Sequence, residues 1–81
     1  MAPYQVWYIN RRGKHKMRME HPGLIDALRH VANLGGYDCD QEGGFFAYII
    51  DKQTGLVADG NQWKTKEQAL KDHPVLEGIV I

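Results

Sequence analysis

The chain contains no serine and only one cysteine, Cys39, among its 81 residues. A serine nucleophile is therefore excluded, and no internal disulfide bond can form. Chains without disulfides are typical of reducing compartments, so we expect a cytoplasmic protein. Cys39 lies between Asp38 and Asp40, and nearby negative charge disfavours the reactive thiolate. We therefore do not expect a catalytic cysteine either.

Long apolar segments are also missing. No run of eighteen apolar residues is present, so we expect no transmembrane helix and no membrane partner. The first residues do not combine a basic start with an apolar run, so no signal peptide is expected. With 43% hydrophobic and 25% charged residues, the composition is that of a globular protein. We expect a single α+β domain over residues 1–81, with a thin core.

Strand-forming segments are separated by turn residues. Apolar, aromatic or alternating patterns predict strands at residues 4–9, 14–19, 45–51 and 56–59, and a short apolar strand at 77–81. Turns are expected at NRRG (10–13) and KQTG (52–55). The strand at 45–51 is apolar on both faces and should therefore be central.

Two helices are predicted between these strands. Apolar residues recur at helical spacing in the segment 21–36, which has Pro22 near its start and glycines at its end. A second helix is expected at 65–73. Thr65 and Gln68 have the spacing of a capping box, and Pro74 cannot continue the helix.

The two halves of the chain show the same order of elements. A shift of 42 residues aligns Gly13 with Gly55 and Leu28 with Leu70, and each half then contains a hairpin followed by a helix. The order ββα–ββα, with a terminal strand, predicts an α+β fold. We expect an antiparallel sheet with two helices packed on one face.

Charge is distributed unevenly along the chain. The net charge is zero, yet residues 1–18 carry five basic groups and no acidic group, so residues 19–81 carry a net charge of −5. Such asymmetry is typical of surfaces that bind nucleic acid or an acidic partner. Attraction between the two parts of the chain is the alternative interpretation.

The basic residues are concentrated in the first predicted hairpin. Symmetric pairing around residues 10–13 places Trp7 opposite Lys16, on one face with Lys14 and Arg18. Cations can bind phosphates while an exposed tryptophan stacks on an unpaired base. A register shift of one residue would move Trp7 to the other face. Lysines on an edge strand also discourage aggregation, so a solvent-exposed edge is the plainer alternative.

The acidic segment 38–43 resembles part of a calcium-binding loop. Its acidic residues and Gly43 match the first half of an EF-hand loop, but Ile49 occupies the position of the bidentate glutamate. The four histidines are not spaced as a zinc site. No nucleotide-binding or catalytic motif is present. We therefore expect no metal, no cofactor, no catalytic residues and no enzymatic activity.

These observations favour a small binding module that works by surface contacts. A protein partner is favoured, with nucleic acid as the alternative and a homodimer through the strand at 77–81 as a third interpretation. The expected partner-binding residues are Trp7, Arg11, Arg12, Lys14, Lys16, Arg18, Asp38, Asp40 and Glu42. In size and in its lack of catalytic motifs, the chain resembles small accessory proteins of phages and mobile elements, some of which inhibit host machinery.

Overall fold

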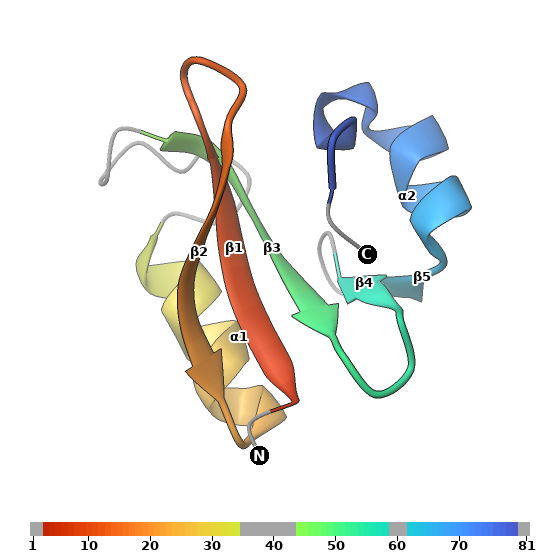
Figure 1. The fold of residues 1–81 in the computed structure, drawn as a ribbon. Coiled ribbons are helices and arrows are strands. Elements are labelled where there is room, and N and C mark those ends of the chain that lie inside the picture. The colour runs from red at the N-terminus through yellow and green to blue at the C-terminus, as the bar shows by residue number, and fades with distance from the viewer. Residues whose placement is uncertain (1–2, 35–43, 59–61, 80–81) are drawn as a thin grey trace.

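The computed structural model describes residues 3–34, 44–58 and 62–79. Within these ranges the chain forms an antiparallel sheet of five strands in the order β2-β1-β3-β4-β5 (Figure 1). The elements are β1 (Tyr4–Asn10), β2 (His15–His21), α1 (Leu24–Asn33), β3 (Gly44–Asp51), β4 (Val57–Ala58), β5 (Trp63–Lys64), α2 (Lys66–Asp72) and the 3-10 helix η2 (Pro74–Leu76). The α+β class and the ββα order are confirmed, with the short strand β5 added before α2.

Both hairpins turn at a glycine with positive φ. Gly13 has φ 81° and Gly55 has φ 74°, a backbone conformation that favours glycine. In the first turn, the side-chain oxygen of Asn10 accepts hydrogen bonds from the backbone N–H groups of Arg12 (2.9 Å) and Lys14 (3.0 Å). In the second turn, Asp51 accepts from the N–H of Gln53 (2.9 Å). The two glycines that the 42-residue shift aligns therefore both allow the positive φ that a hairpin turn needs.

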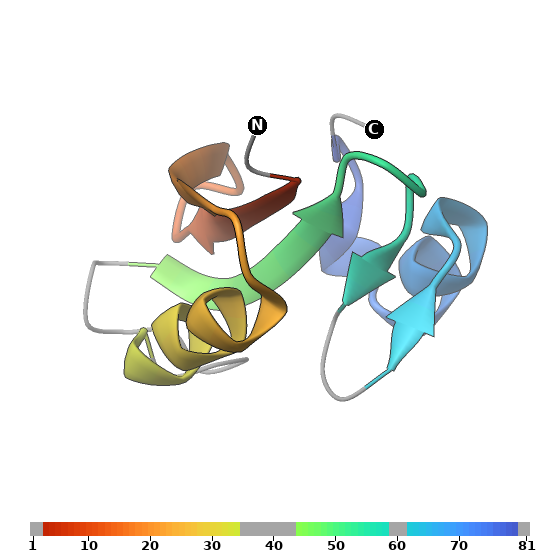
Figure 2. The ribbon, with the colours of Figure 1, turned by 90° about the horizontal axis from the view of Figure 1, so that it is seen from below.

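The two helices lie on opposite faces of the sheet, not on one face as expected (Figure 2). On β3, Ala47 and Ile49 pack with Ala27 of α1. The alternate residues Tyr48 and Ile50 pack in a second cluster, which includes the α2 and η2 residues Ala69 and Leu76. Successive side chains of a strand point to opposite faces. Because β3 buries both sets, each face of the sheet needs its own cover. The central position predicted for this strand is confirmed.

The C-terminal segment is not a strand through residue 79. Pro74 opens the 3-10 helix η2, and the N–H of Ile79 donates to the carbonyl of Leu76 (3.0 Å). Gly78 has φ 97°, which departs from extended geometry. Residues 80–81 lie outside the described residues. The strand expected at 77–81, on which the homodimer interpretation depends, is therefore not formed in the part of the segment that is described.

Helix α2 has the predicted N-cap, Thr65, but the Gln68 side chain bonds to Asp72 and not to the backbone of Thr65 as a capping box would require. Thr65 accepts a hydrogen bond from the N–H of Gln68 (3.2 Å), which confirms the N-cap. The Gln68 side chain donates to Asp72 (3.0 Å), one helical turn further on. Neither described helix is long and apolar enough to cross a membrane.

Candidate functional site

Strand β2 forms one edge of the sheet and is largely exposed. It pairs with β1, and it is the outermost strand of the described sheet. The five consecutive residues 16–20 are all exposed. Two of them are apolar: the exposed fractions of Met17 and Met19 are 43% and 53%. Within the described sheet, no second strand pairs with the outer side of β2, and this edge also presents apolar side chains.

The observed hairpin register differs by one residue from the predicted one. The N–H of Asn10 donates to the carbonyl of Lys14 (3.0 Å), so three residues form the loop. Ile9 then lies opposite His15, and Trp7 lies opposite Met17 instead of Lys16. The Asn10 side chain stabilises this loop, because it accepts from two backbone N–H groups that the turn leaves unpaired.

Trp7 is consequently not surrounded by cations. Its ring stacks on the buried Tyr48, with centroids 6.5 Å apart and planes 14° apart. Its Nε1 donates to the side-chain oxygen of Gln5 (3.1 Å). Trp7 also packs against the core cluster on the α2 face. The prediction that Trp7 shares an exposed face with Lys14, Lys16 and Arg18 is wrong.

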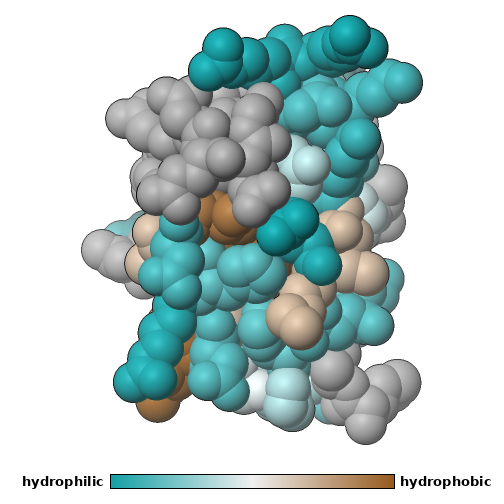
Figure 3. All heavy atoms as spheres, turned by 90° about the vertical axis from the view of Figure 1, so that its left-hand side faces the viewer, coloured by the Kyte–Doolittle hydropathy of each residue, from teal (hydrophilic) through white to brown (hydrophobic). Residues whose placement is uncertain are grey.

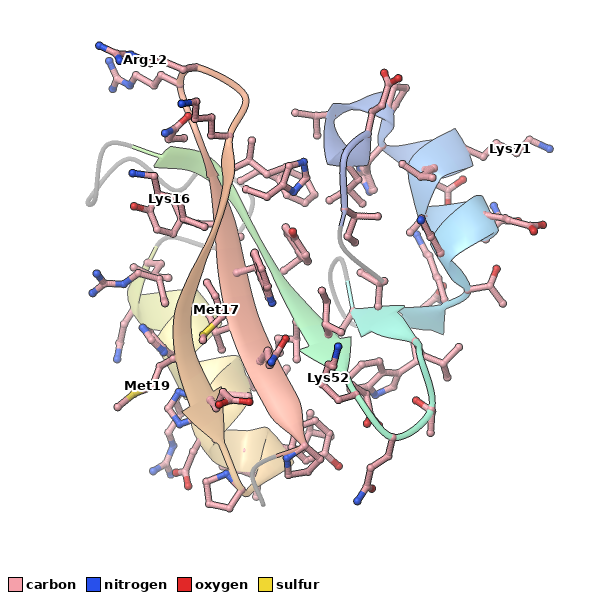
Figure 4. All side chains as sticks on the ribbon, in the orientation of Figure 1. Arg12, Lys16, Met17, Met19, Lys52 and Lys71 are labelled. Carbon is pink, nitrogen blue, oxygen red and sulfur yellow. The ribbon has the colours of Figure 1, made fainter. Side chains whose placement is uncertain are left out.

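The basic residues themselves do gather at the hairpin. Arg11, Arg12 and Lys14 are exposed in and beside the turn, and Lys16 and Arg18 are exposed on β2. Figure 4 places Arg12 at the tip of the hairpin and Lys16, Met17 and Met19 along β2. Arg18 lies where the pairing with β1 is interrupted by a β-bulge opposite Val6 and Trp7. Figure 3, seen from the β2 side, shows a mainly hydrophilic surface with small hydrophobic patches.

His15 fixes the turn end of β2 to the rest of the fold. Its Nε2 lies 2.8 Å from the carbonyl oxygen of Glu77, and its Nδ1 lies 2.7 Å from the hydroxyl of Tyr48. A carbonyl can only accept, so Nε2 donates to Glu77, and in the neutral form of the ring Nδ1 then accepts from the Tyr48 hydroxyl. Burial raises the pKa of that hydroxyl, which therefore remains a donor.

Gly78 lies directly beside the His15 ring. A Cβ atom at Gly78 would lie 3.4 Å from both Cδ2 and Nε2 of the His15 ring. Its positive φ also disfavours a side chain. Sequence reasoning missed this group because His15 and Glu77 are 62 residues apart. The only sequence signal for this role is that His15 interrupts a run of basic residues, between Lys14 and Lys16.

The other end of β2 is joined to α1. Nε2 of His21 lies 2.9 Å from Nδ1 of His30, with the rings edge to face. In the part of the chain that the structure describes, no three histidine, cysteine or acidic residues are grouped as metal ligands. Cys39 and the predicted contacts Asp38, Asp40 and Glu42 lie outside the described residues, and their role remains a prediction.

The sequence and the fold were also compared with known proteins. No protein-family model, curated protein or solved structure matches the chain. The geometry and charge of the β1–β2 hairpin are therefore the basis on which a function can be assigned. We define the hairpin surface as Arg11, Arg12, Lys14, Lys16, Met17, Arg18 and Met19.

Proposed function

We propose that this protein is a small, non-enzymatic, cytoplasmic binding module that contacts a protein partner through the hairpin surface. One observation supports this most strongly. Strand β2 is an edge strand of seven residues, five of them exposed, on which two methionines lie among cations. Arginine and methionine are enriched at protein interfaces, and methionine adapts its shape to a partner. An accessory protein that acts by occupying a surface of another protein needs such a contact surface and no catalytic site.

A protein partner is favoured over nucleic acid because of the position of Trp7. Sites that bind single strands combine cations with an aromatic ring on which bases stack. Here Trp7 stacks on Tyr48 and packs on the core. Tyr8, which lies opposite Lys16, packs against the cluster on the α1 face. The exposed side chains between the cations are methionines, which suit a protein surface better than a base.

Site-specific photo-crosslinking in an extract of the source cells tests this proposal. A photoreactive residue replaces Met17 in one protein and Lys71 in another. Lys71 is exposed on α2, away from the hairpin surface (Figure 4). We expect discrete protein adducts from position 17 that resist nuclease treatment, and none of the same mass from position 71.

A matched pair of charge variants completes the experiment. Arg12→Glu with Lys16→Glu reverses two charges on the hairpin surface, and Lys52→Glu with Lys71→Glu reverses two elsewhere (Figure 4). Both pairs change the net charge equally. We expect only the first pair to abolish the adducts. Adducts that disappear with nuclease, or that both pairs abolish equally, would contradict the proposal.

A further inference from the structure

We infer that the partner supplies an extended, acidic segment that pairs with β2 as an additional strand of the sheet. This inference rests on the proposed function and specifies what the hairpin surface recognises. Three features of β2 support it: its position as an edge strand of the described sheet, the sign of its charge, and the positions of its two methionines.

The backbone of β2 is suited to accept a strand. In an antiparallel sheet, alternate residues of an edge strand direct their N–H and C=O groups away from the sheet. β2 has seven residues and uses only one side to pair with β1 within the described sheet. It contains no proline, and Pro22 follows its last residue. An extended peptide could therefore add main-chain hydrogen bonds along this edge.

The charge of the hairpin determines which strand fits. Residues 10–21 include five cations and one acidic residue, Glu20, and Glu20 accepts a hydrogen bond from Gln5 (3.1 Å). Edge lysines oppose pairing with neutral or basic strands. A second copy of this chain would bring two such basic hairpins together, and like charges facing each other destabilise a pair. An acidic strand experiences attraction at the same positions.

The β-bulge sets the pattern of side chains that the added strand meets. Lys16 lies opposite Tyr8 and Met19 lies opposite Val6. Tyr8 and Val6 are two residues apart and share a face, so Lys16 and Met19 also share a face. Met17, opposite Trp7, lies on the other face. The geometry therefore favours a partner strand with an acidic residue and an apolar residue two positions apart.

The test uses a synthetic peptide of about ten residues, a length that matches an ordinary strand, with the repeat Glu-Thr-Val-Thr. The repeat places glutamate and valine alternately on one face. Two further peptides carry N-methyl groups at the odd or at the even residues, which removes half of the backbone donors without changing charge. A fourth peptide has lysine in place of glutamate. Binding to the full chain is measured by NMR titration at roughly 20 and 150 mM salt.

We expect the acidic peptide to bind and to lose affinity at the higher salt concentration. One N-methylated peptide should bind at least roughly tenfold more weakly, and the other should bind nearly as the parent does, because only one set of N–H groups faces β2. Arg12→Glu with Lys16→Glu should weaken binding by roughly tenfold or more, whereas Lys52→Glu with Lys71→Glu should change it by less than about twofold.

Four results would overturn the inference. Equal binding of both N-methylated peptides would mean attraction between charges without strand pairing. Equal binding of the lysine peptide would remove the preference for acidic segments. The absence of any shift at about 1 mM acidic peptide would remove the site, since even millimolar affinities are detectable in this way. A mixed-sequence oligonucleotide is titrated in the same way, and tighter binding of it than of the acidic peptide would assign the surface to nucleic acid. The crosslinking experiment still decides separately whether the hairpin surface binds a protein.

Discussion

The two edges of the sheet are protected in different ways. Strand β5 has only two residues and leads directly into α2. Its Lys64 forms an ion pair with Asp72 of that helix (2.8 Å), and the Trp63 ring lies 6.2 Å from that of Tyr4. Strand β2 has seven residues and is protected by its cations. Shortness and a neighbouring helix disfavour any added strand, whereas charge disfavours only strands of the wrong sign.

The largest expected loss of stability comes from truncating a buried side chain in the core cluster on the α2 face. Leu76 is fully buried, and Leu76→Ala should lower the free energy of unfolding by about 2–5 kcal/mol because it leaves a cavity. Urea denaturation measures this change. As a control, Ile25 is 67% exposed, and Ile25→Ala should cost less than about 0.5 kcal/mol. Equal effects of the two variants would show that η2 does not pack as described.

The next largest effect concerns the attachment of β2. Tyr48→Phe removes the hydroxyl that is hydrogen-bonded to Nδ1 of His15, and it should lower the free energy of unfolding by about 1–2 kcal/mol. A double-mutant cycle with His15→Leu separates this contact from its surroundings. Strictly additive effects in the cycle would mean that the two side chains do not interact.

A smaller effect is expected at the cap of α2, beside β5. Thr65→Ala removes the oxygen that accepts from the N–H of Gln68, at a cost of about 1 kcal/mol, and Thr65→Ser should keep most of the stability. Neither variant should alter binding of the acidic peptide, because α2 adjoins the opposite edge. A loss of peptide binding in Thr65→Ala at equal folded fraction would contradict the assignment to β2.

Charge reversal on the hairpin should leave folding almost unchanged. Arg12→Glu with Lys16→Glu replaces exposed side chains, so the free energy of unfolding should change by less than about 0.5 kcal/mol. Thermal and urea unfolding measure this, alongside the binding assays. A change of several kcal/mol would indicate that these cations stabilise the fold, and loss of binding could then not be attributed to the surface.

The smallest effect is on how the free energy of unfolding depends on pH in acid, through Asp72 beside β5. The hydrogen bond from Lys64 lowers the pKa of Asp72, with a further contribution from Gln68. A lowered pKa stabilises the folded state above the ordinary pKa of the group, and this contribution is lost as pH falls through the lowered value. NMR titration of the Asp72 carboxyl should show that Lys64→Met raises its pKa toward the ordinary value. An unchanged pKa would exclude the ion pair in solution.

Local patterns in the sequence predicted most of the elements. The strands at the start of each half and the N-cap of α2 follow from alternation and from the spacing of Thr65 and Gln68. The apolar character of β3 on both faces also indicated its central place. A strand that is apolar on both faces also requires packing against both faces of the sheet. The prediction that both helices lie on one face did not take this into account.

The hairpin register could not be obtained in the same way. It depends on the Asn10 side chain, which stabilises a three-residue loop, and on the bulge near Arg18. A difference of one residue moved Trp7 from the predicted binding face onto Tyr48. The cations of the candidate site were found because they are clustered in the sequence. His15 was missed as an anchor because its partners are distant along the chain.

One residue-resolved measurement compares the two edges directly. The acidic peptide is titrated into isotope-labelled protein, and amide shifts and hydrogen exchange are followed at β2 (residues 15–21) and at β5 (residues 63–64). We expect shifts and slowed exchange along β2, on alternate residues, and no change at β5. Equal changes at both edges, or changes confined to the ends of the arginine and lysine side chains, would contradict the assignment of β2 as a docking strand.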